Sequence, residues 1–191
     1  FSKHVAVQRS LAQITCQLES GAPPTRKARP QPLLLIIALE LWVMKEDAPR
    51  YSRGFAWAKL LKFWSSSRND DLAGLVPSSL QLSGRGLSGA LQRTKTSGPG
   101  KKCKWLPIFV DFDASFTGAP WLSTGFELWQ EKGMNFDRDY FVPLPSPDRM
   151  SCIACMATYT DACALSKELY CDLLLPQRCE DGWRFSTSKL L

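Results

Sequence analysis

The sequence predicts an α+β fold that is mainly helical and contains a small antiparallel three-stranded sheet. Two apolar runs of helical character, at about 33–46 and 55–64, precede strand-like runs around a glycine-containing turn, and a second helical region follows. The length of 191 residues suits one domain. With 45% hydrophobic and 22% charged residues, the composition is that of a folded globular protein.

The two apolar runs at the start of the folded region are interpreted as helices. The first contains "PLLLIIALELWVM", residues 32–44, which is shorter than the ~20 apolar residues of a membrane span and includes Glu40, so we expect a buried helix. In the second run, apolar residues at positions i, i+3, i+4 and i+7 form a stripe, and Lys59 and Lys62 lie off it. The stripe consists of Trp57, Leu60, Leu61 and Trp64.

Three short strands are expected after these helices. Gly74 and Pro77 end the helical region, and Leu80 and Leu82 alternate into a first strand. Two further runs, "LSGALQRTKT" and "CKWLPIFV", flank the Ser-Gly-Pro-Gly turn at 97–100. Strand-like runs on both sides of a glycine-containing turn predict a β-hairpin.

The last third of the chain is predicted to be mostly helical. A helix is expected from about Pro120 to Gly133, because proline favours a helix start and glycine a helix end. An extended, proline-rich loop follows over 135–151. A final helix over 152–175 would end before Pro176.

The distribution of charge suggests a polyanionic partner. The net charge is +6, but residues 50–105 hold eleven Lys or Arg against two Asp, whereas 106–191 hold seven against twelve acidic residues. Such a regional basic surface is typical of proteins that bind nucleic acid or, second, an anionic membrane; a solvated basic face is the alternative. We expect a flexible basic and Pro-rich arm at 1–32 and one folded region at 33–191. Seven cysteines without a secretory leader favour an intracellular location.

The order of two helices, an arginine, a short strand and a lysine-bearing hairpin resembles the catalytic domain of the tyrosine recombinases, the phage-integrase superfamily. In that family the first catalytic arginine lies in a G-L-R-x-S-E-L-x-x-L turn, and "SSRNDDLAGL" puts Arg68 at that place and Asp71 on the acidic position. The family's catalytic lysine lies in the next hairpin, where "RTKT" supplies Lys95. The resemblance covers residues 33–132 well and 133–176 loosely, and extends to integrase-like reading frames of mobile elements.

The resemblance implies DNA recombination and integration through a 3′-phosphotyrosine, without a metal ion or other cofactor. Arg68 would bind the non-bridging phosphate oxygens, because a guanidinium stays protonated and donates two parallel hydrogen bonds. Lys95 would protonate the leaving 5′-oxygen, and Asp71 would hold Arg68 in an ion pair. The expected partner is double-stranded DNA, on which an intact recombinase assembles as a multimer, in the nucleus if the source is eukaryotic. Further backbone contacts are predicted for Arg93, Lys101, Lys102 and Lys104.

The chain departs from the family pattern after the hairpin. The family continues with a His-x-x-Arg box, a later His or Trp and the nucleophilic tyrosine, but His4 is the only histidine. Tyr51, Tyr140, Tyr159 and Tyr170 precede the nucleophile's place, and the last two are predicted to be packing residues. Without an initiating Met, the chain is expected to be a fragment or a decayed copy that does not cleave DNA by itself. The alternatives are a non-catalytic DNA-binding relic and an unrelated helical interaction module.

Cysteines and paired aspartates are the remaining candidate ligands. A C-x-x-C pair followed by three more cysteines is compatible with half of a zinc site, but a helix would spread them apart, so we favour small buried thiols and expect no metal. These cysteines are Cys152, Cys155, Cys163, Cys171 and Cys179. Asp111 and Asp113 follow a predicted strand and are interpreted as a helix-start or loop feature.

Overall fold

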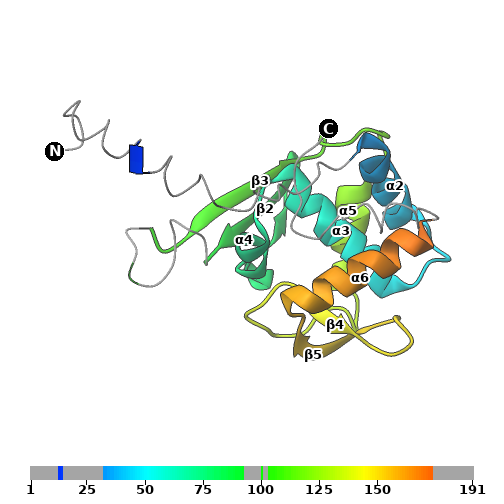
Figure 1. Ribbon diagram of the computed structural model, residues 1–191. Helices are drawn as coiled ribbons and strands as arrows, with labels where there is room; N and C mark the ends of the chain where they lie inside the picture. The colour runs from blue at the N-terminus through cyan, green and yellow to red at the C-terminus, as the bar shows by residue number, and fades with distance from the viewer. Residues whose placement is uncertain (1–12, 15–31, 93–99, 101–102, 174–191) are drawn as a thin grey trace.

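The computed structural model describes residues 13–14, 32–92, 100 and 103–173, in which helices pack around a small sheet (Figure 1). The fold class is α+β, as predicted, and the sheet is antiparallel with the strand order β1-β2-β3. In chain order the elements are α2 (Leu33–Met44), α3 (Arg50–Trp64), α4 (Asn69–Ala73), the 3-10 helix η1 (Pro77–Ser79), β1 (Gln81–Leu82), β2 (Gly86–Leu91), β3 (Leu106–Asp111), α5 (Trp121–Gln130), β4 (Pro143–Pro145), β5 (Cys152–Met156) and α6 (Tyr159–Asp172). No helix of the described ranges is long and apolar enough to cross a membrane.

Helix α3 lies at the centre of the helical body and is buried on nearly all sides. The predicted apolar stripe is therefore only part of its buried surface, because Lys59 and Lys62 are also buried. Lys59 Nζ donates to Ser166 Oγ of α6 at 3.1 Å and lies 4.8 Å from the ring centroid of Tyr170. Burial lowers the pKa of Lys59 well below its usual value and that of Lys62 to about 8.

Aromatic residues join α3 to α5 and to the segment that follows α5. The ring of Trp57 lies 5.7 Å from that of Trp129 and 6.0 Å from that of Phe141. Trp57 Nε1 donates to the Leu122 carbonyl at 3.2 Å. Gly125 allows this close approach, because a Cβ at that position would overlap the indole of Trp57.

A buried carboxylate connects α2 to the loop before α5. Glu40 is fully buried, and its carboxylate accepts hydrogen bonds from Ser115 Oγ (2.9 Å), the Thr117 amide (3.0 Å) and Thr117 Oγ1 (2.8 Å). The Phe116 amide donates to both carboxylate oxygens at 3.1 Å. A buried carboxylate is tolerated when donors surround it in this way.

The C-terminal described region differs from the prediction. Residues 152–175 were expected to form one helix, but β5 precedes α6 and pairs antiparallel with β4, which lies in the expected loop. The helix begins only after Thr158, whose Oγ1 accepts from the Asp161 amide at 3.2 Å. In return, Asp161 accepts from the Thr158 amide at 2.9 Å, so a capping box sets the start of α6.

Candidate nucleic-acid interface

Strands β2 and β3 form a hairpin that extends away from the helical body (Figure 1). The register places Leu87 opposite Val110, and both are buried against the core. Because side chains alternate between the faces of a strand, Ser88 and Phe109 lie on the opposite side. We call this side the outer face; it consists of Gln81, Gly86, Ser88, Ala90, Pro107, Phe109 and Asp111.

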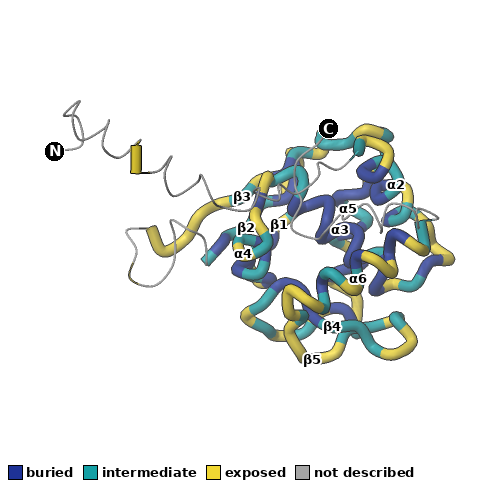
Figure 2. The backbone as a smooth tube through the Cα atoms, viewed as in Figure 1, coloured by how far each residue is buried: buried dark blue, intermediate teal, exposed yellow. Residues whose placement is uncertain are grey.

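Exposed aromatic residues lie along β3 and at its two ends. Phe109 is 48% exposed, Trp105 just before the strand is 50% exposed, and Phe112 just after it is 37% exposed. Figure 2 shows exposure running along β3 and the residues that precede it. Exposed aromatic rings beside basic residues are typical of surfaces that bind nucleic-acid bases.

A basic residue lies at each described end of β3, and Asp111 and Asp113 lie at the same end as Arg85. Lys104 precedes β3 and is exposed. Arg85 is also exposed, and its carbonyl accepts from the Phe112 amide at 3.1 Å, so it lies beside the other end of β3. The remaining hairpin cations of the prediction lie outside the described residues, so their roles stay predictions: Arg93, Lys95, Lys101 and Lys102.

Arg68 is the N-cap residue of α4 and is exposed. The predicted ion pair with Asp71 is wrong: Asp71 Oδ2 accepts from the backbone amide of Arg68 at 2.9 Å. A carboxylate at the third helical position lies next to the free amides of the first turn, so Asp71 binds the backbone amide of Arg68 rather than its guanidinium. In the described part of the chain, the Arg68 guanidinium makes no hydrogen bond or ion pair and faces solvent.

Helix α4 places Arg68 near the end of β2 that leads into the hairpin turn. The Gln92 amide donates to the Gly74 carbonyl at 2.8 Å, and the Val76 amide donates to the Ala90 carbonyl at 3.0 Å. These bonds join the end of α4 to the end of β2. At 1.5 Å per residue, Arg68 lies about 9 Å along the helix from Gly74.

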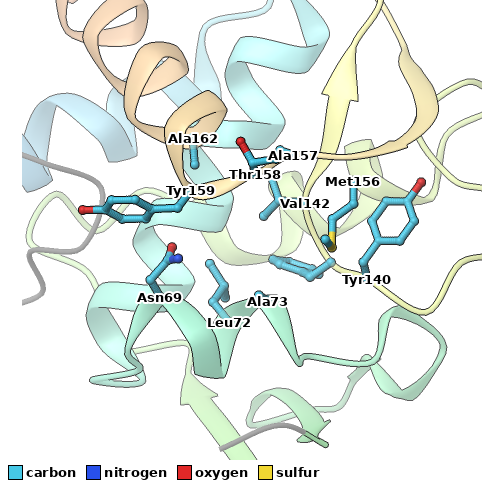
Figure 3. Close-up of a pocket in the computed structure, with 11 residues that line it drawn as sticks. Asn69, Leu72, Ala73, Tyr140, Val142, Met156, Ala157, Thr158, Tyr159 and Ala162 are labelled. Carbon is cyan, nitrogen blue, oxygen red and sulfur yellow. The ribbon is translucent and has the colours of Figure 1, made fainter.

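A pocket lies between α4, the segment that leads into β4, and the start of α6 (Figure 3). Asn69, which follows Arg68, lines it together with Tyr140 and Tyr159. The prediction that Tyr159 is a packing residue is wrong, because it is the first residue of α6 and 44% exposed, with its hydroxyl directed away from the pocket. Tyr170 on the same helix is buried, as predicted.

Sequence reasoning missed Arg138, which lies beside an open groove of about 380 Å³. Its guanidinium stacks 4.9 Å from the Trp129 ring and 4.5 Å from the Phe136 ring, and burial lowers its pKa. Nη1 donates to two backbone carbonyls at 3.3 Å, whereas Nε and Nη2 are buried without a partner. Asp137 and Asp139 flank it in sequence, so the groove lacks the net positive charge that would favour a polyanion.

The cysteines do not form a metal centre in the described residues, which contain no group of three or more His, Cys, Asp or Glu side chains able to hold one. Cys155 and Cys171 are exposed, so the interpretation of all these residues as buried thiols is wrong for these two. Cys152 and Cys163 are partly buried, and burial raises the pKa of Cys152 to about 11. Cys179 lies outside the described residues.

The described residues thus define an α+β protein whose small antiparallel sheet carries an exposed, aromatic and basic hairpin. No protein-family model matches the chain, and searches of curated proteins and of solved structures found no match.

Proposed function

We propose that this protein binds double-stranded DNA through the β2–β3 hairpin and the start of α4, as the front part of a tyrosine-recombinase-like catalytic domain. In an intact recombinase of this kind, DNA is cut and rejoined through a 3′-phosphotyrosine. Arg68 would bind the phosphate, and Lys95 would protonate the leaving 5′-oxygen. A guanidinium suits the first role, because its planar fork matches two phosphate oxygens.

One observation carries the proposal: the exposed residue Arg68 begins a short helix that is hydrogen-bonded to the turn-side end of β2, in a hairpin whose connecting segment is basic. Residues 85–104 contain six Lys or Arg and no Asp or Glu. Arg68 is not held by Asp71, so phosphate binding requires no ion pair to be broken. Neutralising several phosphates releases counterions, which is the main source of affinity for DNA of any sequence.

The salt dependence of binding to a 20-base-pair duplex tests the proposal. The slope of log K against log salt is negative, and its magnitude should decrease by about 0.9 in Arg68→Ala and by about 0.9 in Lys104→Ala, because each variant loses one phosphate contact. Lys45→Ala is the matched control: Lys45 is an exposed lysine of the α2–α3 loop, on another part of the molecule (Figure 1), and should leave the slope unchanged. Binding without salt dependence, or equal slopes in all variants, would contradict the proposal.

A second candidate function is non-catalytic DNA binding, which is favoured by the absence of a His-x-x-Arg motif from the sequence. The two functions differ in whether a covalent bond to DNA forms. We expect no denaturation-resistant adduct with a nicked duplex substrate, as measured by electrophoresis in detergent. An adduct would instead favour catalysis by this chain. The variants Tyr159→Phe and Tyr140→Phe, tested separately, would then show which tyrosine is bound to the DNA.

A further inference from the structure

We propose that the outer face of the β2–β3 hairpin is a stacking platform for the unpaired bases of a DNA strand, with Phe109 at its centre. This inference rests on the proposed DNA-binding function and adds which form of DNA the hairpin recognises. Duplex contacts through phosphates require only cations. Exposed aromatic rings have no use there, whereas an unpaired base has a π-face that can stack on them.

The neighbours of Phe109 leave one side of its ring open. Its partner on β2 is Ser88, and Gly86 lies two residues away on the same face. A Cβ at Gly86 would lie 3.0 Å from Phe109 Cζ, so the ring reaches over the glycine and contacts the strand there. With only small residues beneath it, the ring stays 48% exposed, and a base could stack on the open side.

One more aromatic residue extends the surface along the strand. At about 3.3 Å per residue, Trp105 lies about 13 Å before Phe109 and shares its side by alternation, and it is 50% exposed. Phe112 is exposed too, but it lies in the turn after β3 and falls on the other side by the same alternation. The hairpin therefore offers room for several nucleotides, and the loss of one base–aromatic stack should weaken binding between about 5-fold and about 150-fold.

The charge of the hairpin favours a polyanion at the Lys104 end of this face. Lys104 lies next to Trp105, whereas Arg85 at the other end of β3 is accompanied by Asp111 and Asp113. Asp111 is the acidic residue of the outer face, and its Oδ1 accepts from the Asp113 amide at 3.0 Å, a loop feature as predicted. That hydrogen bond holds the carboxylate in the turn after β3, beyond Phe109.

A protein strand fits this surface less well than a nucleic acid. The amide of Phe112 donates to the carbonyl of Arg85, the residue before β2. Because backbone groups alternate between the two edges of a strand, residues 107, 109 and 111 direct theirs to the other edge of β3, which pairs with no described strand. Pro107 has no amide hydrogen, which removes one of the donors that an added strand would need. A second copy of this chain would also bring the same positive hairpin charge.

Binding of fluorescently labelled dT15, followed by anisotropy, tests the inference. Phe109→Leu keeps an apolar side chain on the strand but removes the π-face, and it should weaken dT15 binding at least about 5-fold while changing 20-base-pair duplex affinity less than twofold. Phe116→Leu is the matched control. Phe116 is 43% exposed but lies in the loop after β3, 5.0 Å from the Trp64 ring, and its substitution should change neither affinity.

The outcomes separate this inference from the proposed function. Equal dT15 affinity in wild-type and Phe109→Leu protein, with salt-dependent duplex binding intact, overturns the platform and leaves the proposed function standing. If the wild-type protein binds neither dT15 nor the duplex, both the inference and the proposed function are overturned. A concentration-dependent dimer in sedimentation that Phe109→Leu dissociates would show that a second copy covers this face, which also overturns the inference.

Discussion

The helical body and the β2–β3 hairpin use aromatic residues in opposite ways. In the body, Trp57, Trp129 and Phe141 are almost fully buried, with ring centroids between 5.1 and 6.0 Å apart. On the hairpin, Trp105 and Phe109 keep about half of their surface exposed. The difference lies in the neighbours: α2, α5 and α6 enclose α3, whereas no described element covers the outer face near Phe109.

This contrast separates stability from binding. Substitutions around α3 should change the free energy of unfolding, because they disturb close packing or buried polar groups. Substitutions on the outer face should change the affinity for DNA and leave folding nearly intact. Measurements of unfolding by urea, followed by circular dichroism, can test the contrast at single positions.

The largest effect is expected for Gly125→Ala. The added methyl group would overlap Trp57, and neither α3 nor α5 can move without disturbing the other aromatic contacts. The unfolding free energy should fall by about 3 kcal/mol. Gly84→Ala is the control, because a Cβ there meets nothing within 4 Å and should change stability by less than about 0.5 kcal/mol. Similar values for both variants would contradict the packing described for α3 and α5.

Glu40→Gln should have the next largest effect. The amide group keeps the shape of the side chain, but its nitrogen must replace either Oε2, which accepts from Ser115 and Thr117, or Oε1, which accepts from the Phe116 amide, and it cannot accept a hydrogen bond in either place. We expect a loss of about 2 kcal/mol in unfolding free energy. The exposed Glu127→Gln is the matched control, with little change expected. An equally stable Glu40→Gln protein would mean that this carboxylate does not hold the loop.

Lys62 should make stability depend on pH. Its pKa is about 8 in the folded protein and 10.5 when unfolded, so the unfolded chain binds more protons between these values. This group therefore makes the unfolding free energy rise as pH increases from 8 to 10.5, by about 1 kcal/mol or more. Lys62→Met should remove this share of the rise, leaving that of Lys59, and be the more stable protein at pH 7. Parallel stability curves for the two proteins, measured with reduced cysteines, would contradict the burial of a charge-bearing Lys62.

The smallest effect on stability is expected for Phe109→Leu. The ring is half-exposed and contacts mainly β2, so the unfolding free energy should fall by less than about 1 kcal/mol. Because a variant with so small a loss of stability stays folded, its weaker binding of dT15 can be attributed to the loss of stacking. A decrease close to that of Gly125→Ala would place Phe109 with the core residues and remove the contrast between the two regions.

Much of the fold could be predicted from local patterns. Helices α2, α3 and α5 lie where the apolar runs and the prolines indicated, and the hairpin follows from its turn residues. Strand β5 could not be predicted, because Cys152–Met156 is a short apolar run compatible with helix or strand. Its pairing with β4 decides between them, and that contact lies between segments with no shared local signal.

The candidate site was predicted in part. The position of Arg68 before a short strand follows from the motif, but whether Asp71 pairs with its guanidinium or its backbone amide depends on three-dimensional geometry. Alternation along "LPIFV" could have shown that Phe109 and Val110 lie on opposite faces of the strand. Which of the two faces the core is decided only by the helices on one side of the sheet.

The sequence by itself determined the order of α2, α3, the three-stranded sheet and α5 and the concentration of basic residues between 85 and 104, because periodicity, turns and charge are local properties. Only the tertiary structure decided that Glu40, Lys59 and Lys62 are buried while Phe109 is exposed. The physical reason is that burial depends on which distant segments cover a residue. Those segments are brought together by the packing of the whole core rather than by the residue's own neighbours in sequence.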